Sequence, residues 1–246
     1  MISETVVETT EPDQLSEAVQ QVMATPYVDR LRTGRFNARV NMAAFSRLGM
    51  MTVAANNLHV EVPAGTGYTT VNMPLAGEIT TDQGTFSAGL VPHTADVTLT
   101  ELPLTLKSEA TTTMVMRFDD LLLEEAAVKL TGGRSTTALN FDGVLNLRYQ
   151  PGRMFAHRAN LAWSAIHSDE LNEPTRQRPV ELELAADFLL AAQAERTPAL
   201  GAHDDAPVVA AIQRVEEWIM ANLAEPISRA DLCDVSGLHV RTLTRG

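Results

Sequence analysis

The pattern that most constrains the fold runs from about Phe36 to Phe118. Short runs rich in Val, Thr, Met and Leu are separated there by turn sequences such as "NN", "PAGTG", "DQG" and "VPH". The segment "YTTVNMPLAG" alternates with the two-residue period of a strand, setting Thr69, Val71, Met73 and Leu75 against Tyr68, Thr70 and Asn72. Several short strands separated by turns predict a β-sandwich or barrel here.

Helical periodicity flanks this β-rich stretch on both sides. The predicted helices cover residues 12–23 before it, and 119–133, 151–167 and 179–195 after it. In "DDLLLEEAAVKLTGG", Asp119 or Asp120 can cap the start, and Gly132 or Gly133 can end the helix in a left-handed conformation. The overall prediction is an α+β chain.

Composition and charge restrict where such a chain works and what it binds. The 246 residues carry a formal net charge of −12, so any contact with nucleic acid has to be local. The sequence has no run of about 18 apolar residues, and its start, "MISETVVETTEPDQ", is acidic where a signal peptide would be basic. We therefore expect a cytoplasmic protein with no membrane partner. The single cysteine, Cys233, is expected to be a small buried residue.

A domain boundary is predicted at "RTPALGAHDDAP", residues 196–207, which is short in apolar residues and bracketed by prolines. This linker would separate a first domain, residues 1–195, from a second, residues 208–246. The second opens with an amphipathic helix whose apolar residues recur at spacings of three and four, namely Val208, Ile212, Val215, Ile219 and Leu223.

The terminal stretch "SRADLCDVSGLHVRTLTRG" has the pattern of a short capped helix, a glycine turn and the start of a second helix. Arg241 and Arg245 are four residues apart, so they share a helix face with Thr244 beside them. Such a face can reach phosphates and guanine edges in a DNA major groove. An ordinary helical hairpin with a solvated basic face is the alternative.

Taken together, the β-rich domain, the helical connector, the linker and the run "ANLAEPISRADLCDVSGLHVRTLTR" resemble the AraC/XylS family of bacterial transcription regulators. The stretch "GYTTVNMPLAGEITTDQGTF" is similar to the family's strand, glycine turn and strand. The resemblance implies a cupin-like domain that binds a small organic effector and forms a homodimer, followed by two helix-turn-helix units that bind promoter DNA. The apolar stripe around Leu182 to Leu190 is the expected dimer contact.

Within the terminal motif, the resemblance implies DNA contacts at Arg241, Thr244 and Arg245, with His239 and Val240 at the start of the recognition helix. His239 departs from the family pattern, which usually has serine there, and histidine is a weaker helix cap. The family pattern continues into a second helix-turn-helix that this sequence does not contain. We therefore expect a fragment of a regulator, with weak or no promoter binding by itself.

Catalytic and metal chemistry find little support in the residue pattern. The six histidines include no His-x-His pair, and nothing near His59 and Glu61 completes a metal site. A Gly-x-Ser-x-Gly turn and a phosphate-binding glycine loop are both missing from the sequence. We expect no catalytic residue, no metal and no cofactor, and hence no enzyme. The alternatives are a cupin-type metal-dependent enzyme and a stand-alone sensor that sequesters a full-length regulator.

A barrel interior could instead hold a small organic molecule among apolar walls with a few polar groups. Strand alternation places Tyr68, Thr70 and Asn72 on one face, and Arg47 and His93 are polar residues of the same β-rich region. The candidate effector contacts are therefore Arg47, Tyr68, Asn72 and His93.

Overall fold

The computed structural model describes residues 5–20, 22, 27–30, 35–64, 67–84, 86–98, 102–132, 143–168, 171, 173–196 and 235. The chain divides into two units, Met1–Arg196 and Thr197–Gly246, and only Val235 of the second is among these residues. The predicted linker beyond Arg196, Cys233 and the predicted DNA contacts His239, Val240, Arg241, Thr244 and Arg245 all lie outside the described residues.

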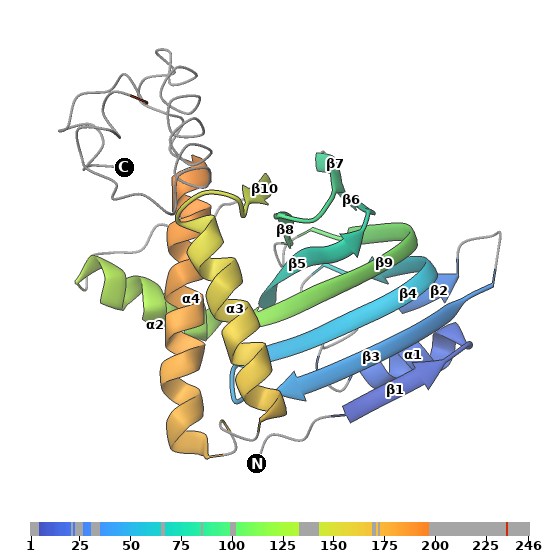
Figure 1. Ribbon diagram of the computed structural model, residues 1–246, viewed down its shortest axis with the longest axis horizontal. Helices are drawn as coiled ribbons and strands as arrows, with labels where there is room; N and C mark the ends of the chain where they lie inside the picture. The colour runs from blue at the N-terminus through green and yellow to red at the C-terminus, as the bar shows by residue number, and fades with distance from the viewer. Residues whose placement is uncertain are drawn as a thin grey trace. The chain divides into compact units, whose positions relative to one another are not determined.

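One antiparallel sheet dominates the first unit, and its long strands curve so that the sheet wraps around an inner face (Figure 1). In the described residues the strands are β1 (Thr5–Thr9), β2 (Tyr27–Arg30), β3 (Asn37–Ala44), β4 (Leu48–Val62), β5 (Tyr68–Gly77), β6 (Ile79–Gln83), β7 (Phe86–Leu90), β8 (Thr94–Thr98), β9 (Leu104–Asp119) and β10 (Gly143–Asn146). Their main order is β1-β3-β4-β9-β5-β8-β10, with β2 on β4 and β6 between β7 and β9. This confirms the predicted β-rich domain and the α+β class.

Alternation along the long strands separates two large apolar clusters, one on each face of the sheet. A smaller third cluster contains Ile79, Leu90, Leu104 and Leu106. On β4, Leu48 and Met50 join the cluster on the outer face, whereas Met51 and Val53 join the cluster on the inner face. The same alternation holds on β9, where Met114 and Met116 face outward. Successive residues of a strand point to opposite faces of the sheet, so the position of a residue along its strand decides which cluster it enters.

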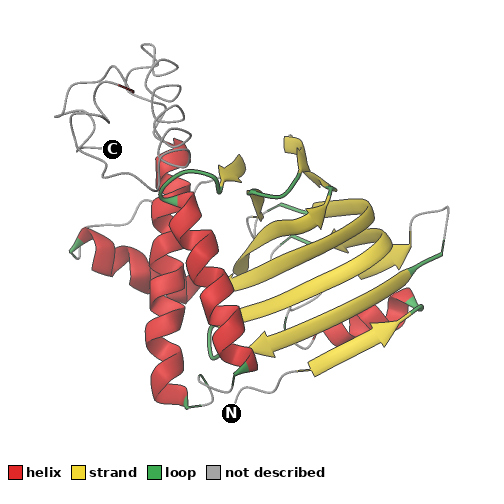
Figure 2. Cartoon of the chain, in the orientation of Figure 1, coloured by secondary structure: helices red, strands yellow, loops and turns green. Residues whose placement is uncertain are grey.

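Three helices pack against the outer face at one end of the long strands, namely α2 (Asp120–Thr131), α3 (Gly152–His167) and α4 (Pro174–Arg196) (Figure 2). Phe118 of β9 stacks on Phe188 of α4 with ring centroids 5.3 Å apart, and Phe155 of α3 lies 5.9 Å from Phe188. These three rings are fully buried and hold the helices to the sheet.

The predicted caps of α2 are confirmed. The Asp119 side chain accepts a hydrogen bond of 2.9 Å from the amide of Leu121, which satisfies a donor at the helix start. Gly132 ends the helix with φ of 65°, a left-handed conformation that costs glycine little.

On the inner face, α1 (Pro12–Gln20) packs its apolar side against the sheet. Leu15 and Val19 enter the same cluster as Val40, Met51 and Val53. The sequence predicted this helix, and it ends at Gln20 rather than at Met23. A helix is thus positioned across the concave side of the curved sheet, opposite the three-helix layer.

The apolar stripe around Leu182 to Leu190, where we expected a dimer contact, is mostly buried within the chain. Leu184, Phe188 and Leu189 are buried within the chain, in the cluster that joins α4 to the sheet. Most of the stripe thus packs in the core of one chain, whereas Leu190 is exposed. The dimer contact itself stays a prediction. The helix also begins earlier than expected, at Pro174, so that Pro179 lies inside it. In the described part of the chain, no helix is long and apolar enough to span a bilayer.

Candidate functional site

A small cavity of about 70 Å³ lies between α1 and the inner face of the sheet. Apolar side chains make most of its wall, namely Leu15, Val19, Met51, Val53, Leu58, Val60, Val62, Ile79, Leu104, Leu106 and Val115. The polar residues at the wall are Tyr68, Thr70, Asn72, Lys107, Ser108 and Thr113. An apolar enclosure with a few convergent polar groups is typical of a site for a small organic molecule.

The volume of the cavity limits what it holds without a change in the protein. A water molecule occupies roughly 30 Å³ in the liquid, and pockets for drug-sized ligands measure roughly 300–1,000 Å³. An organic ligand therefore has to displace part of the wall. Among the described residues of the wall, α1 is the only helix, and it contributes Leu15 and Val19. It is therefore the element that a ligand would move against the sheet.

The start of β5 supplies the polar side of the cavity. Tyr68, Thr70 and Asn72 all line it, whereas Val71 and Met73 enter the outer cluster. The alternation in "YTTVNMPLAG" placed these three residues on one face, and the structure brings them together there. All three are buried.

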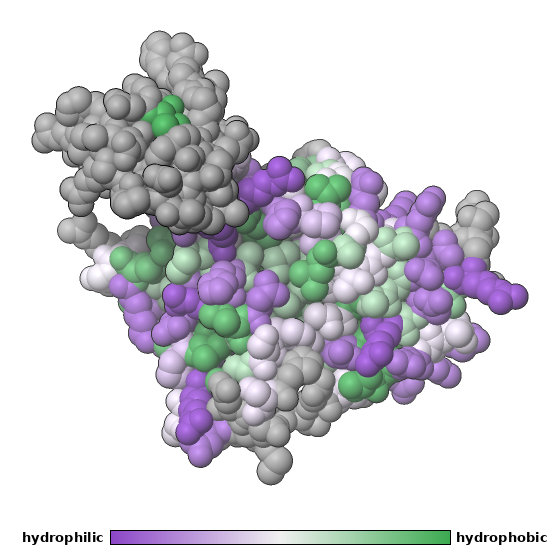
Figure 3. Space-filling view, viewed as in Figure 1, coloured by the Kyte–Doolittle hydropathy of each residue, from purple (hydrophilic) through white to green (hydrophobic). Residues whose placement is uncertain are grey.

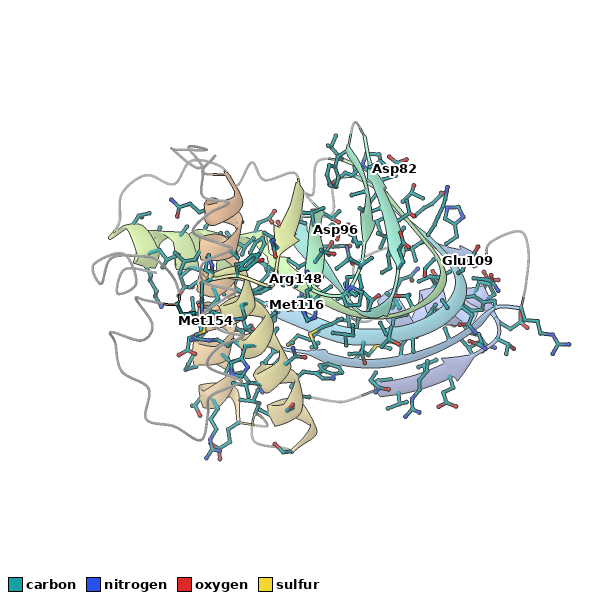
Figure 4. The ribbon with its side chains drawn as sticks, turned by 45° about the horizontal axis from the view of Figure 1, so that its top comes forward. Asp82, Asp96, Glu109, Met116, Arg148 and Met154 are labelled. Atoms are coloured by element: carbon teal, nitrogen blue, oxygen red, sulfur yellow. The ribbon has the colours of Figure 1, made fainter. Side chains whose placement is uncertain are left out.

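Asn72 also belongs to a buried hydrogen-bond network behind the cavity wall. Its side-chain amide donates to Asp96 Oδ1 at 2.7 Å and to Thr98 Oγ1 at 3.4 Å. The Thr81 hydroxyl donates to Asp96 Oδ2 at 2.5 Å. Asp96 projects from β8 among the neighbouring strands, in the part of the sheet that Figure 4 shows from above.

Burial raises the pKa of Asp96 from the ordinary value of 3.8 to about 6. The cause is loss of water around the carboxylate, which the hydrogen bonds from Thr81 and Asn72 offset only in part. Asn72, a residue of the cavity wall, therefore donates a hydrogen bond to an acid whose pKa lies near 6. Asp96 was not among the residues predicted from the sequence, although it is an acid inside the alternating stretch "ADVTLTELPLTL".

A second missed residue is Arg117 on β9. It pairs in register with Thr70 of β5 and with Gly49 of β4, so it continues the inner face one step beyond Val115. Its guanidinium carbon lies 5.7 Å from the centroid of the Tyr68 ring. The alternation of "TTTMVMRF", which places Met114 and Met116 outward, could have assigned Arg117 to the inner face.

Arg47 and His93 do not line the cavity. Arg47 lies in the turn between β3 and β4, where its amide donates to Glu181 Oε1 at 2.6 Å and its guanidinium lies 3.3 Å from Glu125 Oε2. His93 is exposed in the turn between β7 and β8, with φ of 71°. Two of the four candidate effector contacts, Tyr68 and Asn72, thus lie at the cavity, and the other two lie elsewhere on the first unit.

Another hollow among the described residues is an open groove of about 820 Å³ between the β1–α1 connection, the end of β5 and the middle of β9. Small residues such as Ala55, Gly77 and Thr111 form much of its floor. The described residues contain no group of three His, Cys, Asp or Glu placed to hold a metal ion. His59 Nε2 lies 3.4 Å from Glu61 Oε1.

A curved antiparallel sheet that encloses a mainly apolar cavity, with helices packed on its outer face, is the architecture of a cupin-like ligand-binding domain. Comparison with known families agrees: the family model of the AraC-binding-like domain matches residues 15–190. The chain belongs to this family, and the match covers both the cavity and the helical layer.

Among solved structures, one AraC-like regulator shares the fold, and two others superpose only in part. The AraC-like transcriptional activator CuxR superposes with a TM-score of 0.60 at 14% identity, covering 98% of this chain and 87% of that one. KdgF from Halomonas sp. gives a TM-score of 0.31 at 9% identity over 33% of this chain and 80% of that one. A mutant of the Bacillus subtilis oxalate decarboxylase OxdC gives 0.30 at 6% identity, over 37% of this chain and 29% of that one. No curated protein sequence gives a significant match.

Proposed function

We propose that the first unit is the sensor of a ligand-responsive transcription regulator, and that a small organic effector binds in the cavity between α1 and the sheet. The observation that carries the proposal is the apolar cavity with Tyr68, Thr70 and Asn72 on one side, in a chain of the AraC-binding-like family. Effector binding displaces α1 and alters the balance between DNA-binding states. The second unit contributes Arg241, Thr244 and Arg245, with His239 and Val240 at the helix start, to promoter contacts that are weak or absent for residues 1–246 by themselves.

The cavity assignment is tested by thermal unfolding of the chain in the presence of a panel of small organic compounds. Binding to the folded state raises the melting temperature. The variant Val53→Phe fills the cavity from β4, so compounds that stabilise the unsubstituted chain should no longer do so. Val128→Phe, which adds the same volume at an exposed site on α2, is the matched control. Retained binding in Val53→Phe would refute the cavity as the effector site.

We also propose that the regulator is a homodimer that uses the exposed side of the helical layer. Met154 and Leu161 of α3 are exposed apolar residues, and the molecular face that carries α3 mixes apolar with polar side chains (Figure 3). Leu190 of α4 is exposed as well. Sedimentation of the chain should give a dimer, and Leu161→Glu should shift it toward monomer. A dimer unaffected by Leu161→Glu would place the contact elsewhere.

A further inference from the structure

A buried carboxylate stands directly behind one polar residue of the cavity wall. Asp96 of β8 and Asn72 of β5 oppose each other in the antiparallel pair, and each residue is only 2% exposed. Both carboxylate oxygens of Asp96 are bonded, Oδ1 to the Asn72 amide at 2.7 Å and Oδ2 to the Thr81 hydroxyl at 2.5 Å. A ligand therefore meets Asn72, which lines the cavity, and not Asp96 behind it.

The carboxylate determines which end of the Asn72 amide faces the cavity. An ionised carboxylate only accepts hydrogen bonds, so the amide nitrogen has to point toward it. Asn72 Nδ2 indeed donates to Asp96 Oδ1, and it also lies 3.4 Å from Thr98 Oγ1 on the same strand. The amide oxygen is then turned away from β8, toward β9. There the residue in register with Asn72 is Val115, which lines the cavity.

The Asn72 carbonyl oxygen is an acceptor that lacks a donor. No group in the described part of the chain donates to it, and it is not enclosed by protein atoms, so it is open to the cavity. A buried acceptor without a donor destabilises the folded chain, and a bound molecule that supplies the donor removes this loss. Thr70, two residues earlier on the same face, adds a hydroxyl that can donate or accept.

The charge of Asp96 restricts the donor to a neutral group. Above about pH 6 this carboxyl is ionised, and a second negative charge beside a buried carboxylate is strongly disfavoured. A ligand cation cannot reach the carboxylate directly, because both of its oxygens are already bonded. A hydroxyl group satisfies the polar end, and side chains such as Met51 and Val53 of the wall accommodate a hydrocarbon body.

We propose that Asp96 is a positioning residue that turns the Asn72 carbonyl toward the cavity, and that the cavity thereby selects a neutral alcohol with a compact apolar body. The ligand hydroxyl donates to Asn72 Oδ1 and accepts from the Thr70 hydroxyl. This inference rests on the proposed function, because it names the ligand class of the same cavity and the residue that determines it.

The test compares cyclohexanol with cyclohexanone, which has nearly the same shape but only accepts hydrogen bonds. Binding of each to the full chain is measured at neutral pH by calorimetry and thermal shift. We expect the alcohol to bind about tenfold more tightly, because the ketone leaves the buried Asn72 acceptor unpaired. Equal binding of the two compounds would overturn the proposal, and so would a lack of binding by either at millimolar concentration.

Substitutions of Asp96 separate positioning from a general structural role. Asp96→Leu has a side chain of similar volume that accepts no hydrogen bond, so Asn72 is no longer held and most of the preference for the alcohol should be lost. Asp96→Asn keeps an acceptor and should retain the preference. Asp82→Leu, at an exposed position on β6, is the matched control and should retain it too. If Asp96→Leu and Asp96→Asn show the same preference, Asp96 is not a positioning residue.

A measurement on the unsubstituted chain does not depend on whether Asp96→Leu folds. The nuclear magnetic resonance signal of the Asn72 side-chain carbonyl carbon changes when its oxygen accepts a hydrogen bond. Cyclohexanol should shift this signal, and cyclohexanone should shift it much less. Equal shifts with the two compounds would contradict donation to the Asn72 carbonyl.

The outcomes also distinguish this inference from the proposed function. If the alcohol and the ketone bind equally and Val53→Phe abolishes both, the cavity is the effector site but Asn72 does not select a donor. If the alcohol is preferred and Val53→Phe leaves its binding unaffected, the selection by Asn72 stands and the cavity assignment fails.

Discussion

Replacement of Asp96 by asparagine should change how the stability of the fold depends on pH. Burial raises the pKa of this carboxyl from 3.8 to about 6, so the folded chain holds the proton more tightly than the unfolded chain. Below about pH 4 both states are protonated and the group costs nothing. As the pH rises to about 6 the folded state loses stability, by about 3 kcal/mol in total for this difference in pKa.

The asparagine variant keeps the shape of the side chain but stays neutral at every pH. Its carbonyl oxygen can accept from Asn72, and its amide can donate to the Thr81 hydroxyl, in place of the bonds that Asp96 makes. The ionisation cost should therefore disappear. Relative to the unsubstituted chain, Asp96→Asn should gain up to about 3 kcal/mol in free energy of unfolding between about pH 4 and pH 7.

Urea unfolding followed by circular dichroism, at several pH values across that interval, measures the effect. Other acids contribute to both curves, so the informative quantity is the difference between the two proteins at each pH. Asp82→Asn removes the same charge from an exposed position on β6 and controls for net charge (Figure 4). If the free energy of unfolding changed with pH in the same way in Asp96→Asn and in the unsubstituted chain, the raised pKa of Asp96 would be refuted.

Two further substitutions test the packing around the sheet. Gly77→Ala should destabilise the fold by more than about 2 kcal/mol, because φ is 78° and the new Cβ would lie 2.1 Å from the carbonyl oxygen of Ala110. Gly67→Ala, also at positive φ but with no atom within 4 Å, should cost about 1 kcal/mol in the same urea assay; equal costs would contradict the close approach at Gly77. Glu181→Ala should lower the free energy of unfolding by roughly 3 kcal/mol, because it leaves the Arg47 amide without its acceptor. A change under about 0.5 kcal/mol would contradict a stabilising role for the hydrogen bond between Arg47 and Glu181.

Local signals in the sequence predicted much of the fold. Two-residue alternation identified the β-rich stretch and the shared face of Tyr68, Thr70 and Asn72, because each strand has one face toward each core. Cap residues predicted the bounds of α2, because an acid at the start and a glycine at the end satisfy backbone groups within the same segment.

Features that depend on distant segments could not be predicted in this way. Arg47 and His93 lie in turns, where no alternation fixes the direction of a side chain, and neither lines the cavity. The network of Asp96 joins three strands, so its partners emerge only once the strands are paired. The apolar stripe of α4 was visible, but the sequence could not decide between a core within one chain and a contact between two.

The central claim is that a small organic molecule binds on the inner face of the sheet, and methyl spectra of the methionines test it most directly. Met51 lines the cavity, whereas Met114 and Met116 face the helical layer on the opposite side of the same sheet. Adding a compound that raises the melting temperature should shift the Met51 methyl resonance and leave those of Met114 and Met116 nearly unchanged. Shifts at Met114 and Met116 with none at Met51 would contradict the claim.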